Sequence, residues 1–342
     1  MIKALVHNPY WDSLGGGERY TAAFIRLLLD HSWQVDLAWP KDISASVKSR
    51  FGIDISAAIF NSQFSTLNSA KYDLLFWVTD GSLPVSLAPK TIVHCQFPFT
   101  GVGGRSFKNL LKSRFYTFIC NSRFTKSFID REFMVNSRVV YPPIATAVFP
   151  PRAKTNTLLY VGRFSHLTQA KNPHLLIRAF KEIHSRLPGW RLVLAGGAGV
   201  GTPADAISHL RSQAAGLPVD IITNPSMARL KSLYGQAKLF WSASGLGIDQ
   251  HTQPLKVEHF GISVVEAMSA GCVPIIPALG GHPEIVDPGQ NGFLYHTLDD
   301  LGSLTLKLTT DRRQLTTLSQ AAIDKSKMFD TTVFNDGFFR LI

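Results

Sequence analysis

Two carboxylates in the second half of the chain have a spacing that could bind a sugar. Glu258 and Glu266 are separated by seven residues and flank Gly261, after which the pattern predicts the start of a helix. A carboxylate accepts hydrogen bonds from sugar hydroxyls, whereas a helix N-terminus attracts phosphate through its unpaired N–H groups. The expected donors are the backbone N–H groups of Ile262, Ser263 and Val264. This combination indicates a site for a sugar nucleotide.

A glycine-rich segment near the N-terminus is a second candidate for phosphate binding. Gly15, Gly16 and Gly17 follow the predicted strand Ala4–His7 and precede helical spacing that starts at Tyr20. Glycines in a strand–turn–helix unit let backbone N–H groups approach a phosphate closely. The spacing matches neither GxGxxG nor a Walker loop, so a flexible turn is the alternative interpretation.

Two cations follow a predicted strand and could neutralise a departing diphosphate. Arg163 comes directly after the strand Leu158–Gly162, and Lys171 ends the ensuing loop. A guanidinium binds phosphate bidentately, and an ammonium acts as a point charge. Gly197, after the strand Arg191–Ala195, is a further backbone candidate. The alternative is that Arg163 and Lys171 are solvated surface charges.

His94 is the candidate histidine of the first half. It lies where the predicted strand Thr91–Cys95 ends, beside Gln96 and Pro98. Ligands of open α/β sheets collect at the carboxyl ends of strands, so this position is suited to meeting a substrate. A structural histidine inside the core is the competing interpretation.

The composition excludes several classes of protein. Of the 342 residues, 45% are hydrophobic and 17% are charged, which excludes a disordered chain. The net charge of +11 favours an anionic partner, namely a phosphorylated ligand, an acidic membrane or nucleic acid. No aromatic–basic motif supports nucleic-acid binding. Because no apolar run reaches the length of a membrane span or signal peptide, we expect a soluble, cytoplasmic protein.

The sequence contains no pattern that requires a metal ion. Cys95, Cys120 and Cys272 are far apart and lie among apolar residues, which favours buried free thiols over a metal cluster. No Asp-x-Asp motif is present. Because arginine, lysine and a helix dipole can together stabilise a leaving diphosphate, we expect chemistry that is independent of metal.

Strand and helix patterns alternate along the chain, which predicts α/β domains with parallel, doubly wound sheets. In the first half, strands are expected at Ala4–His7, Val35–Trp39, Leu74–Val78, Thr91–Cys95, Phe118–Asn121 and Val139–Tyr141. In the second half, they are expected at Leu158–Gly162, Arg191–Ala195, Val219–Thr223, Leu239–Ser242 and Val273–Ile276. Proline-bearing segments at Pro142–Pro143 and Phe149–Thr157 predict a linker between domains of residues 1–150 and 151–328. A helix over 329–342 is expected to pack back on the first domain.

These motifs resemble those of the family-four retaining glycosyltransferases of the GT-B fold, over nearly the whole chain. The most specific is Glu258-x7-Glu266 within EHFGISVVEAMSAG, and GGGER, YVGRF and LAGG support it in the same order. The resemblance implies two Rossmann-like domains facing across a cleft, with the acceptor on the N-terminal side and the nucleotide sugar on the C-terminal side. It also implies that Glu258 holds donor-sugar hydroxyls, Glu266 holds the ribose, and His94 orients the sugar. Transfer would retain the anomeric configuration without a protein nucleophile.

Within the family, the motif sequences are most similar to those of mannosyltransferases like the one that elongates the dolichol-linked oligosaccharide. FWSASGLGID running into EHFGI carries this likeness, together with VHCQFP, CNSRFT and VVYPP. It implies GDP-mannose as the donor, a UDP-sugar as the alternative, and a glycan or lipid-linked acceptor. The loop between Arg163 and Lys171 is longer than in many members. Lys171 is the expected second diphosphate ligand, with Arg178 or Lys181 as the alternative.

The segment Arg105–Phe115 has the pattern of a basic amphipathic helix, with apolar residues at helical spacing. It could rest on the cytosolic face of an anionic membrane and present a lipid-linked acceptor. It could equally pack on the protein's own core.

Other functions share part of this pattern. A nucleotide-sugar epimerase or a phosphorylase also has twin Rossmann-like domains, although the setting of E-x7-E disfavours an epimerase. A nicotinamide-dependent oxidoreductase would need GxGxxG and a downstream acid. A non-catalytic sensor or partner subunit would bind the donor without transferring its sugar.

Overall fold

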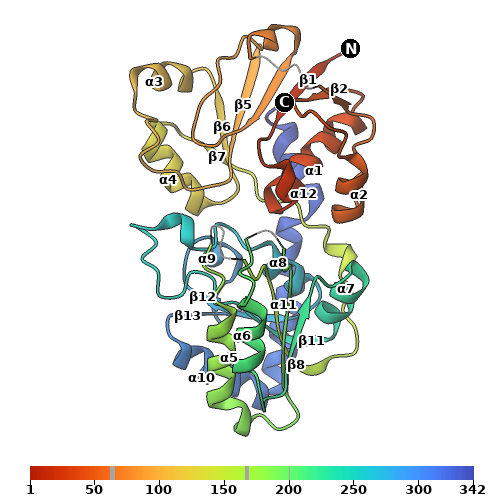
Figure 1. Ribbon diagram of the computed structural model, residues 1–342, viewed down its shortest axis with the longest axis vertical. Coiled ribbons are helices and arrows are strands. Elements are labelled where there is room, and N and C mark those ends of the chain that lie inside the picture. The colour runs from red at the N-terminus through yellow and green to blue at the C-terminus, as the bar shows by residue number, and fades with distance from the viewer. Residues whose placement is uncertain (62–65, 166–168, 200) are drawn as a thin grey trace. The chain divides into compact units, whose positions relative to one another are not determined.

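The computed structural model describes residues 1–61, 66–165, 169–199 and 201–342. Backbone contacts divide the chain into two compact units (Figure 1). Unit 1 contains Met1–Pro143 and Thr332–Ile342, and unit 2 contains Ile144–Thr331. Each unit is a parallel sheet covered by helices, which confirms the predicted α/β fold class.

The described residues of unit 1 form a 7-stranded parallel sheet. Its strands are β1 (Lys3–His7), β2 (Gln34–Leu37), β3 (Ile59–Phe60), β4 (Leu74–Val78), β5 (Lys90–Cys95), β6 (Thr117–Cys120) and β7 (Arg138–Val139). They lie in the order β3-β2-β1-β4-β5-β6-β7, so the sequence order reverses between β1 and β4. The sequence pattern does not predict β3, because two residues are too few to show alternation.

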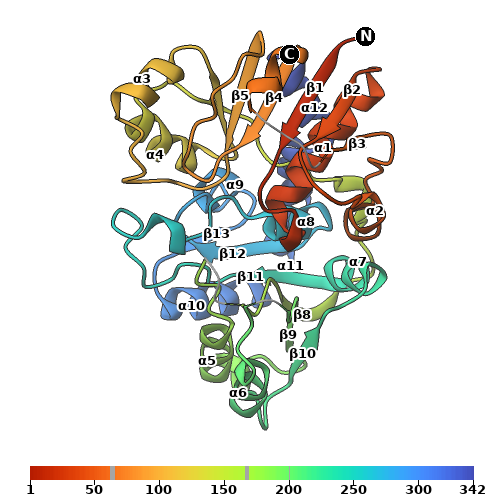
Figure 2. The ribbon, with the colours of Figure 1, turned by 45° about the horizontal axis from the view of Figure 1, so that its top comes forward.

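Helices cover both faces of this sheet (Figure 2). They are α1 (Gly16–Asp30), α2 (Ser44–Phe51), α3 (Phe107–Ser113), α4 (Arg123–Phe133) and α12 (Thr331–Phe339), with 3₁₀ turns at Trp11–Ser13 and Thr66–Lys71. On one face α1 meets α12, where the rings of Phe24 and Phe338 are 4.5 Å apart. On the other face Phe133 of α4 packs against Phe118 of β6. Because alternate strand residues point to opposite faces, each strand contributes to both layers of the core.

Helix α1 begins at Gly16, before the predicted start at Tyr20. Glu18 explains the earlier start, because its carboxylate accepts the Gly15 N–H at 2.6 Å and the Ser13 hydroxyl at 2.5 Å. A side chain reaching back in this way satisfies a donor that the helix end would otherwise leave open. A Cβ on Gly17 would lie 1.6 Å from the Gln96 side-chain oxygen, so the Gln96 side chain would have to move to admit it.

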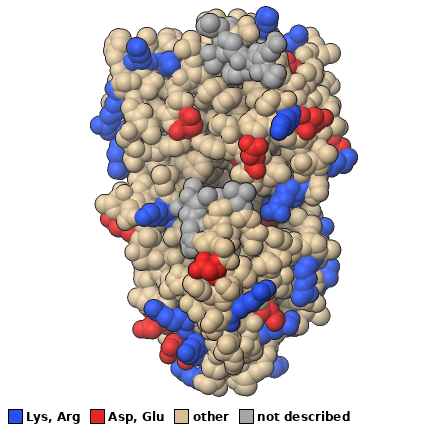
Figure 3. Space-filling model, viewed as in Figure 1, with Lys and Arg blue, Asp and Glu red and all other residues tan. Residues whose placement is uncertain are grey.

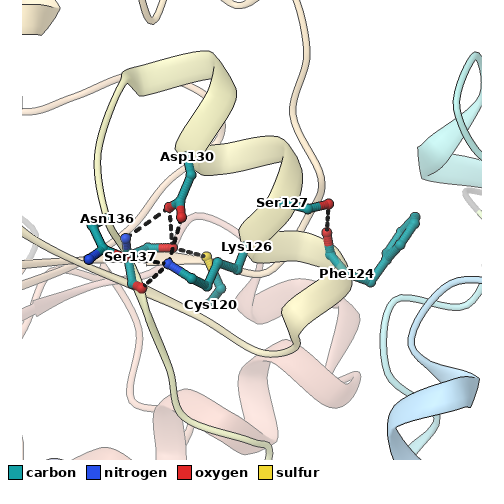
Figure 4. A network of polar contacts seen from close by, with 7 residues as sticks. All are labelled: Cys120, Phe124, Lys126, Ser127, Asp130, Asn136 and Ser137. Carbon is teal, nitrogen blue, oxygen red and sulfur yellow. Dashed lines mark hydrogen bonds and ion pairs between the residues drawn. The ribbon is translucent and has the colours of Figure 1, made fainter.

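A polar network joins α4 to the short edge strand β7 (Figure 4). The Lys126 ammonium donates to the Asp130 carboxylate and to the Ser137 carbonyl, each at 2.5 Å. Asp130 in turn accepts from the N–H and hydroxyl of Ser137 at 2.8 and 2.6 Å. These bonds stay within neighbouring elements, so the network secures the sheet edge.

The described residues of unit 2 form a 6-stranded parallel sheet. Its strands are β8 (Thr155–Val161), β9 (Arg191–Gly196), β10 (Val219–Thr223), β11 (Ala237–Trp241), β12 (Val273–Pro277) and β13 (Phe293–Tyr295). The order β10-β9-β8-β11-β12-β13 reverses between β8 and β11. The sequence analysis does not predict β13, whose three residues pair only with β12 at the sheet edge.

Helices also cover both faces of the second sheet. They are α5 (Pro173–Ile183), α6 (Ala206–Gln213), α7 (Met227–Gln236), α8 (Ile262–Ser269), α9 (His282–Ile285), α10 (Leu298–Thr310) and α11 (Arg312–Ser326), with 3₁₀ turns at Thr146–Val148, His184–Arg186, Pro254–Lys256 and Lys327–Phe329. Leu176 of α5 and Leu301 of α10 pack with Leu192 of β9 in one buried cluster. On the opposite face, Tyr234 of α7 packs against Phe240 of β11.

The charged surface is mixed. On the face drawn in Figure 3, the described lysines and arginines are spread out among acidic residues rather than gathered in one patch. In the part of the chain that the structure describes, no helix combines the length and hydropathy that crossing a membrane requires.

Candidate active site

A largely buried ion pair lies where the strand order of unit 2 reverses. Lys171, in the loop after β8, donates to Glu258 Oε2 at 2.5 Å. The two side chains are 16% and 13% exposed, so they are shielded from water without being sealed. Ligands of open α/β sheets bind at the carboxyl ends of strands at such a reversal. The structure therefore brings together the predicted cation and the predicted sugar-binding carboxylate.

Backbone hydrogen bonds hold Lys171 in place. The Ala170 N–H donates to the Lys256 carbonyl at 2.9 Å, and the Gly245 N–H donates to the Ala170 carbonyl at 2.8 Å. Asn172 has a left-handed backbone (φ 48°) that turns the chain into α5. The prediction of a long loop after Arg163 concerns a segment whose residues 166–168 lie outside the described residues.

The Glu258 carboxylate is held in its ionised form. Burial raises the pKa of Glu258, but the charge and hydrogen bond of the Lys171 ammonium, together with the nearby His282 and His259, lower it to about 2. The hydroxyl of Ser244, in the loop after β11, donates a further bond of 3.2 Å. A carboxylate has about four lone-pair sites and an ammonium three donors, so both groups keep capacity for a ligand.

Close backbone packing fixes Glu258 from behind. The Gly281 N–H donates to the Glu258 carbonyl at 2.8 Å. A Cβ on Gly280 would lie 2.0 Å from the same carbonyl oxygen, and a Cβ on Gly281 would lie 2.4 Å from the His259 carbonyl oxygen. The glycine pair is therefore a packing requirement that sets the position of the carboxylate.

Arg163 lies at the same end of β8 and is exposed. The buried phenol of Tyr160 is close enough to both Arg163 and Glu258 to be affected by their charges. Burial raises the pKa of Tyr160, the Glu258 carboxylate raises it further, and the Arg163 guanidinium lowers it. Both charges therefore act on one buried phenol. The Phe164 N–H donates to the Gly197 carbonyl at 2.9 Å, which ties the Arg163 loop to the end of β9.

The close approach between β8 and β9 depends on Gly196, which precedes Gly197, the predicted backbone candidate for phosphate binding. A Cβ on Gly196 would lie 1.6 Å from the Gly162 carbonyl oxygen. A Cβ on Gly197 would meet no described atom within 4 Å. Gly197 therefore borders open space at the carboxyl edge of the sheet.

The first turn of α8 is open to an anion. Gly261, its N-cap, has φ 120° and caps the helix with no side chain. The Val264 N–H donates to the Gly261 carbonyl at 3.0 Å, which corrects the expectation that it is a free donor. The N–H groups of Ile262 and Ser263 have no acceptor among the described residues. These two amides and the helix dipole form the phosphate-attracting end.

Glu266 lies in the second turn of α8, beyond the open amides. The hydroxyl of the buried Tyr234, on α7, donates to Glu266 Oε2 at 3.0 Å. This bond fixes one carboxylate oxygen relative to α7. A carboxylate can accept several hydrogen bonds at once.

Two buried histidines flank this region. Burial lowers the pKa of both His259 and His282 to about 4, so both are neutral at pH 7. His282 Nδ1 lies 3.1 Å from the Pro277 carbonyl oxygen, which assigns its proton to Nδ1. Neither ring is suited to proton transfer near pH 7.

The predicted residues of unit 1 form a group within that unit. His94 is fully buried and stacks on Tyr20 of α1 at 4.0 Å, and burial lowers its pKa to about 3. Neither ring nitrogen has a hydrogen-bond partner among the described residues. The Gly15 N–H is taken by Glu18, which corrects the expectation that Gly15 offers a donor to phosphate. Gly16 and Gly17 are the first residues of α1.

Sequence reasoning misses the hydroxyl partners of the two carboxylates. Ser244 precedes Glu258 by 14 positions, and Tyr234 precedes Glu266 by 32. A lone hydroxyl at such a distance carries no spacing signal; only its place after a strand or on a facing helix could have indicated it. Arg178 and Lys181, the alternatives to Lys171, lie exposed on α5.

Metal-binding groups are not clustered in the described chain. There, histidine, cysteine, aspartate and glutamate side chains form no group of three or more that could hold a metal ion. The described cations and open backbone donors at this site are Arg163, Lys171 and the start of α8.

Comparisons with known proteins give the family and the fold. The model of the family described as glycosyl transferases group 1 matches residues 145–325, which is more than half of the chain. The chain is 25% identical over 227 residues to GDP-Man:Man(3)GlcNAc(2)-PP-Dol alpha-1,2-mannosyltransferase of Dictyostelium discoideum, covering 62% of this chain and 43% of that protein. It is 29% identical over 148 residues to spore coat protein SA of Bacillus subtilis (strain 168), covering 42% and 36%.

A third relative also carries a mannosyltransferase name. GDP-mannose:cellobiosyl-diphosphopolyprenol alpha-mannosyltransferase of Komagataeibacter xylinus is 31% identical over 143 residues, covering 42% of this chain and 33% of that protein. The chain thus spans less than half the length of each of these relatives.

Solved structures match along the entire chain. Anabaena HepE in complex with UDP has a TM-score of 0.75 at 16% identity, covering 100% of this chain and 99% of that one. Sucrose-phosphate synthase from Thermosynechococcus elongatus has a TM-score of 0.71 at 16% identity, covering 100% and 98%. Both have the GT-B fold, so the predicted fold is confirmed.

Proposed function

The chain belongs to the glycosyl transferases group 1 family, and we propose that it moves a hexose from a sugar nucleotide to a glycan or lipid-linked acceptor. The observation that carries this proposal is the Lys171–Glu258 pair beside the open start of α8. It joins a cation, a sugar-binding carboxylate and two free amides at the strand reversal of unit 2. Those groups fit a diphosphate with a sugar at its end.

Breaking the bond to the sugar places negative charge on the departing diphosphate. Arg163, exposed at the end of β8, would pair with phosphate oxygens bidentately. Lys171 would bridge the phosphate and the Glu258 carboxylate, since its ammonium has three donors. The amides of Ile262 and Ser263 add fixed dipoles. Groups already aimed at developing charge stabilise it without reorganisation, which supports transfer without a metal ion.

Glu258 and Glu266 would hold the two sugars of the donor. Glu258 is ionised and buried, so it accepts hydrogen bonds from the hexose hydroxyls. Glu266, steadied by Tyr234, would accept from the ribose hydroxyls. For His94 of unit 1 the resemblance implies a role in orienting the hexose; its ring is fully buried and neutral, so it is not suited to act as a base. Without a protein nucleophile, the departing phosphate would direct attack to the same face, and the anomeric configuration would be retained.

GDP-mannose is the donor we propose. Two of the relatives named above carry GDP-mannose in their names, and the wording of the strand β11 and Glu258 segments supports the same subgroup. A UDP-sugar is the second candidate, because the fold is also that of a structure solved with UDP. Calorimetry with both nucleotides separates the two donors.

A membrane surface is the proposed place of the acceptor, and α3 supports it. Phe107, Leu111 and Phe115 recur every four positions and are 83%, 51% and 77% exposed, whereas Ser113 is buried. The apolar face therefore points outward, which argues against the alternative in which it packs on the core. Exposed Lys108 and Arg114 lie beside these residues in sequence and match anionic headgroups in charge.

Flotation with vesicles containing phosphatidylglycerol tests this surface at low salt. The wild-type chain is expected to float, and the Phe107→Ser, Leu111→Ser, Phe115→Ser triple variant to stay at the bottom. The double variant Lys108→Glu, Arg114→Glu is expected to lose flotation. The control Lys41→Glu, Arg50→Glu makes the same charge change at other exposed positions and is expected to keep it. Equal losses in both charge pairs would contradict a specific membrane face.

Product analysis with radiolabelled donors tests the function itself. We expect slow release of free mannose from GDP-mannose, and faster transfer when polyprenyl-linked oligosaccharides are added. Arg163→Ala should reduce turnover by at least about 100-fold, as loss of a charged transition-state contact does. A chain that binds donor but neither hydrolyses nor transfers it would be a non-catalytic subunit. A free product with an inverted ring carbon would identify an epimerase.

A further inference from the structure

Three successive carbonyls at the C-terminal end of α7 accept hydrogen bonds from the chain that leads into β8. This capping segment, residues 152–155, lies within the stretch that the sequence pattern predicts as a linker. The last carbonyls of a helix have no partner within it, so the segment satisfies groups that α7 leaves open. The bonds run from the Arg152 N–H to Gly235 at 3.1 Å, from the Thr155 hydroxyl to Gln236 at 3.2 Å and from the Lys154 ammonium to Ala237 at 2.8 Å.

Lys154 also reaches the neighbouring helix α8. Its ammonium donates to the Ala270 carbonyl at 2.7 Å, and Ala270 is the C-cap residue of α8. Ala237 is the C-cap residue of α7, so one half-buried ammonium joins the ends of both helices. A helix dipole favours a cation at the C-terminus, and bonds from an ammonium to carbonyls are charge-assisted.

The two helices that Lys154 joins carry the two partners of a bond in the candidate site. The Tyr234 hydroxyl, on α7, donates to Glu266 Oε2, on α8, at 3.0 Å. Tyr234 precedes Ala237 by three positions, and Glu266 precedes Ala270 by four. About one helical turn therefore separates each of them from the carbonyl that Lys154 holds. A shift of either helix at its end would change the Tyr234–Glu266 contact directly.

A thiol makes a second, weaker link at the same place. Cys272 Sγ donates to the carbonyls of Tyr234 and Ala237 at 3.1 and 3.3 Å. Burial raises the pKa of Cys272 to about 11, so the group is a thiol at pH 7. Because a thiol is a weak donor and an ammonium a strong one, Lys154 provides the main connection between the helix ends.

We propose that Lys154 is a positioning residue of the donor site, which sets α7 against α8 and so keeps Glu266 within reach of the ribose hydroxyls. The inference rests on the proposed function, in which Glu266 holds the ribose. The 8 residues of α8 rise by about 12 Å, which separates Lys154 at the C-terminal end from the open amides at the start. Its effect on the nucleotide therefore passes through Glu266.

A purely structural role for Lys154 predicts a different result. Loss of the two carbonyl bonds would then lower the melting temperature and leave the selectivity of the site unchanged. The quantity that separates the two roles is the preference for GDP over 2′,3′-dideoxy-GDP, which lacks the ribose hydroxyls. This ratio of two affinities reports on the ribose contact alone, because both nucleotides carry the same base and diphosphate.

Calorimetric titration of the full chain with both nucleotides measures the preference. The wild-type chain should bind GDP at least about tenfold more tightly, as hydrogen bonds to a charged group allow. Lys154→Met keeps the apolar stem and removes the donors, and it should reduce the preference by at least about threefold. Lys154→Arg should restore most of it, because a guanidinium has donors for both carbonyls. Tyr234→Phe should reduce the preference too, and adding Lys154→Met to it should change the ratio by less than about twofold.

Lys238 provides a matched control. It is a half-buried lysine on β11, and its ammonium donates to Asn156 Oδ1 at 2.5 Å and lies over the Trp190 ring. Among the described residues it bonds to no carbonyl of α7 or α8. Lys238→Met removes the same charge and should keep the preference within about twofold of the wild-type value.

Wild-type preference in Lys154→Met, an equal fall in Lys238→Met, or full additivity with Tyr234→Phe would overturn the proposal. Lys154→Gln keeps two N–H donors without the charge, so it folds even where Lys154→Met does not. Its shorter stem cannot join both carbonyls, and a wild-type preference in this variant would also contradict the positioning role. Glu266→Gln separates the two levels of inference. A preference lost in Glu266→Gln and kept in Lys154→Met sinks only the role of Lys154, whereas a preference kept in Glu266→Gln sinks the proposed ribose site and this inference with it.

Discussion

The two sheets reverse their strand order at corresponding places but present different side chains there. In unit 2 the reversal between β8 and β11 presents the Lys171–Glu258 ion pair. In unit 1 the reversal between β1 and β4 presents the stacked rings of His7 and Trp77. The same topology thus places an ion pair at one reversal and stacked aromatic rings at the other. The fold supplies the position, and the side chains decide the chemistry.

The two glycine-led helices differ in the same sense. The start of α1 is closed by its own Glu18, whose carboxylate takes the Gly15 N–H at 2.6 Å. The start of α8 has no side-chain cap and no acid in its first turn, and the ammonium of Lys171 lies against Glu258 just before it. A negative charge is therefore disfavoured at α1 and favoured at α8. Sequence alone marks both helix starts as candidates for phosphate binding and does not show that Glu18 closes the first of them.

Of the substitutions considered, Lys171→Ala should have the largest effect on the difference in stability and donor turnover between the two units' ion pairs. Lys171→Ala leaves the buried Glu258 carboxylate without its partner, which typically costs about 3–5 kcal/mol of unfolding free energy. It should also abolish measurable donor turnover. Lys126→Ala is the control in unit 1, where Lys126 makes an ion pair of the same length, 2.5 Å, with Asp130. That variant should lose stability and keep its affinity for GDP; equal GDP affinity in both variants would contradict the assignment.

Acidification should destabilise the protein through its buried histidines. Because the pKa of His282 falls from 6.5 to about 4 on folding, its contribution is complete above pH 6.5 and is lost as the pH falls towards 4. That contribution is about 3 kcal/mol, and His94 behaves in the same way in unit 1.

Chemical denaturation between pH 7 and pH 4 measures this loss. His94→Phe should flatten the pH dependence by up to about 1.4 kcal/mol per pH unit without weakening stability at pH 7, because no described group bonds to its ring nitrogens. An unchanged slope would show that His94 is already protonated in the folded state.

Substitutions of the adjacent glycines Gly196 and Gly197 test how closely β8 approaches β9. Gly196→Ala would place a Cβ 1.6 Å from the Gly162 carbonyl oxygen, so overpacking should cost about 1–3 kcal/mol. Gly197→Ala meets no described atom within 4 Å and should be nearly neutral. Thermal melting of the two variants distinguishes them. Equal melting temperatures would contradict the close approach.

The smallest expected effect concerns the closed helix start. Glu18→Gln weakens the cap on Gly15 and should lower stability by about 1 kcal/mol, as loss of a capping side chain does. Since the change also removes a negative charge from this edge, GDP affinity should stay equal or rise slightly. A marked fall in GDP affinity would mean that Glu18 serves the ligand instead of the helix.

Elements with strong local patterns could be predicted from the sequence. Leu74–Val78 and Val219–Thr223 are strands with the predicted bounds. The first is a continuous apolar run that is mostly buried, and the second is rich in β-branched residues although it lies at the sheet edge. The short edge strands β3 and β13 could not, since neighbouring strands rather than their own pattern define them. The start of α1 was placed too late, because the reach of Glu18 back to Gly15 overrides the low helix propensity of glycine.

The charged residues of the candidate site could be predicted from the sequence, whereas the hydrogen bonds and ion pairs between them could not. Glu258 and Lys171 could be chosen from residue type and place after a strand, but their direct contact depends on the turn at Asn172 and the anchoring of Ala170. The Val264 N–H is not open to a ligand because it donates to the Gly261 carbonyl, and that bond depends on how tightly the first turn of α8 is wound. Such details follow from tertiary packing, which no spacing encodes.

Calorimetric titration of the chain with GDP and UDP, repeated on Arg163→Ala and on Glu18→Gln, tests the central claim most directly. The account predicts saturable binding of at least one nucleotide by the wild-type chain and a loss of at least about tenfold in Arg163→Ala, with Glu18→Gln unaffected or slightly improved. Wild-type affinity in Arg163→Ala, or no binding of either nucleotide to the wild-type chain, would contradict it.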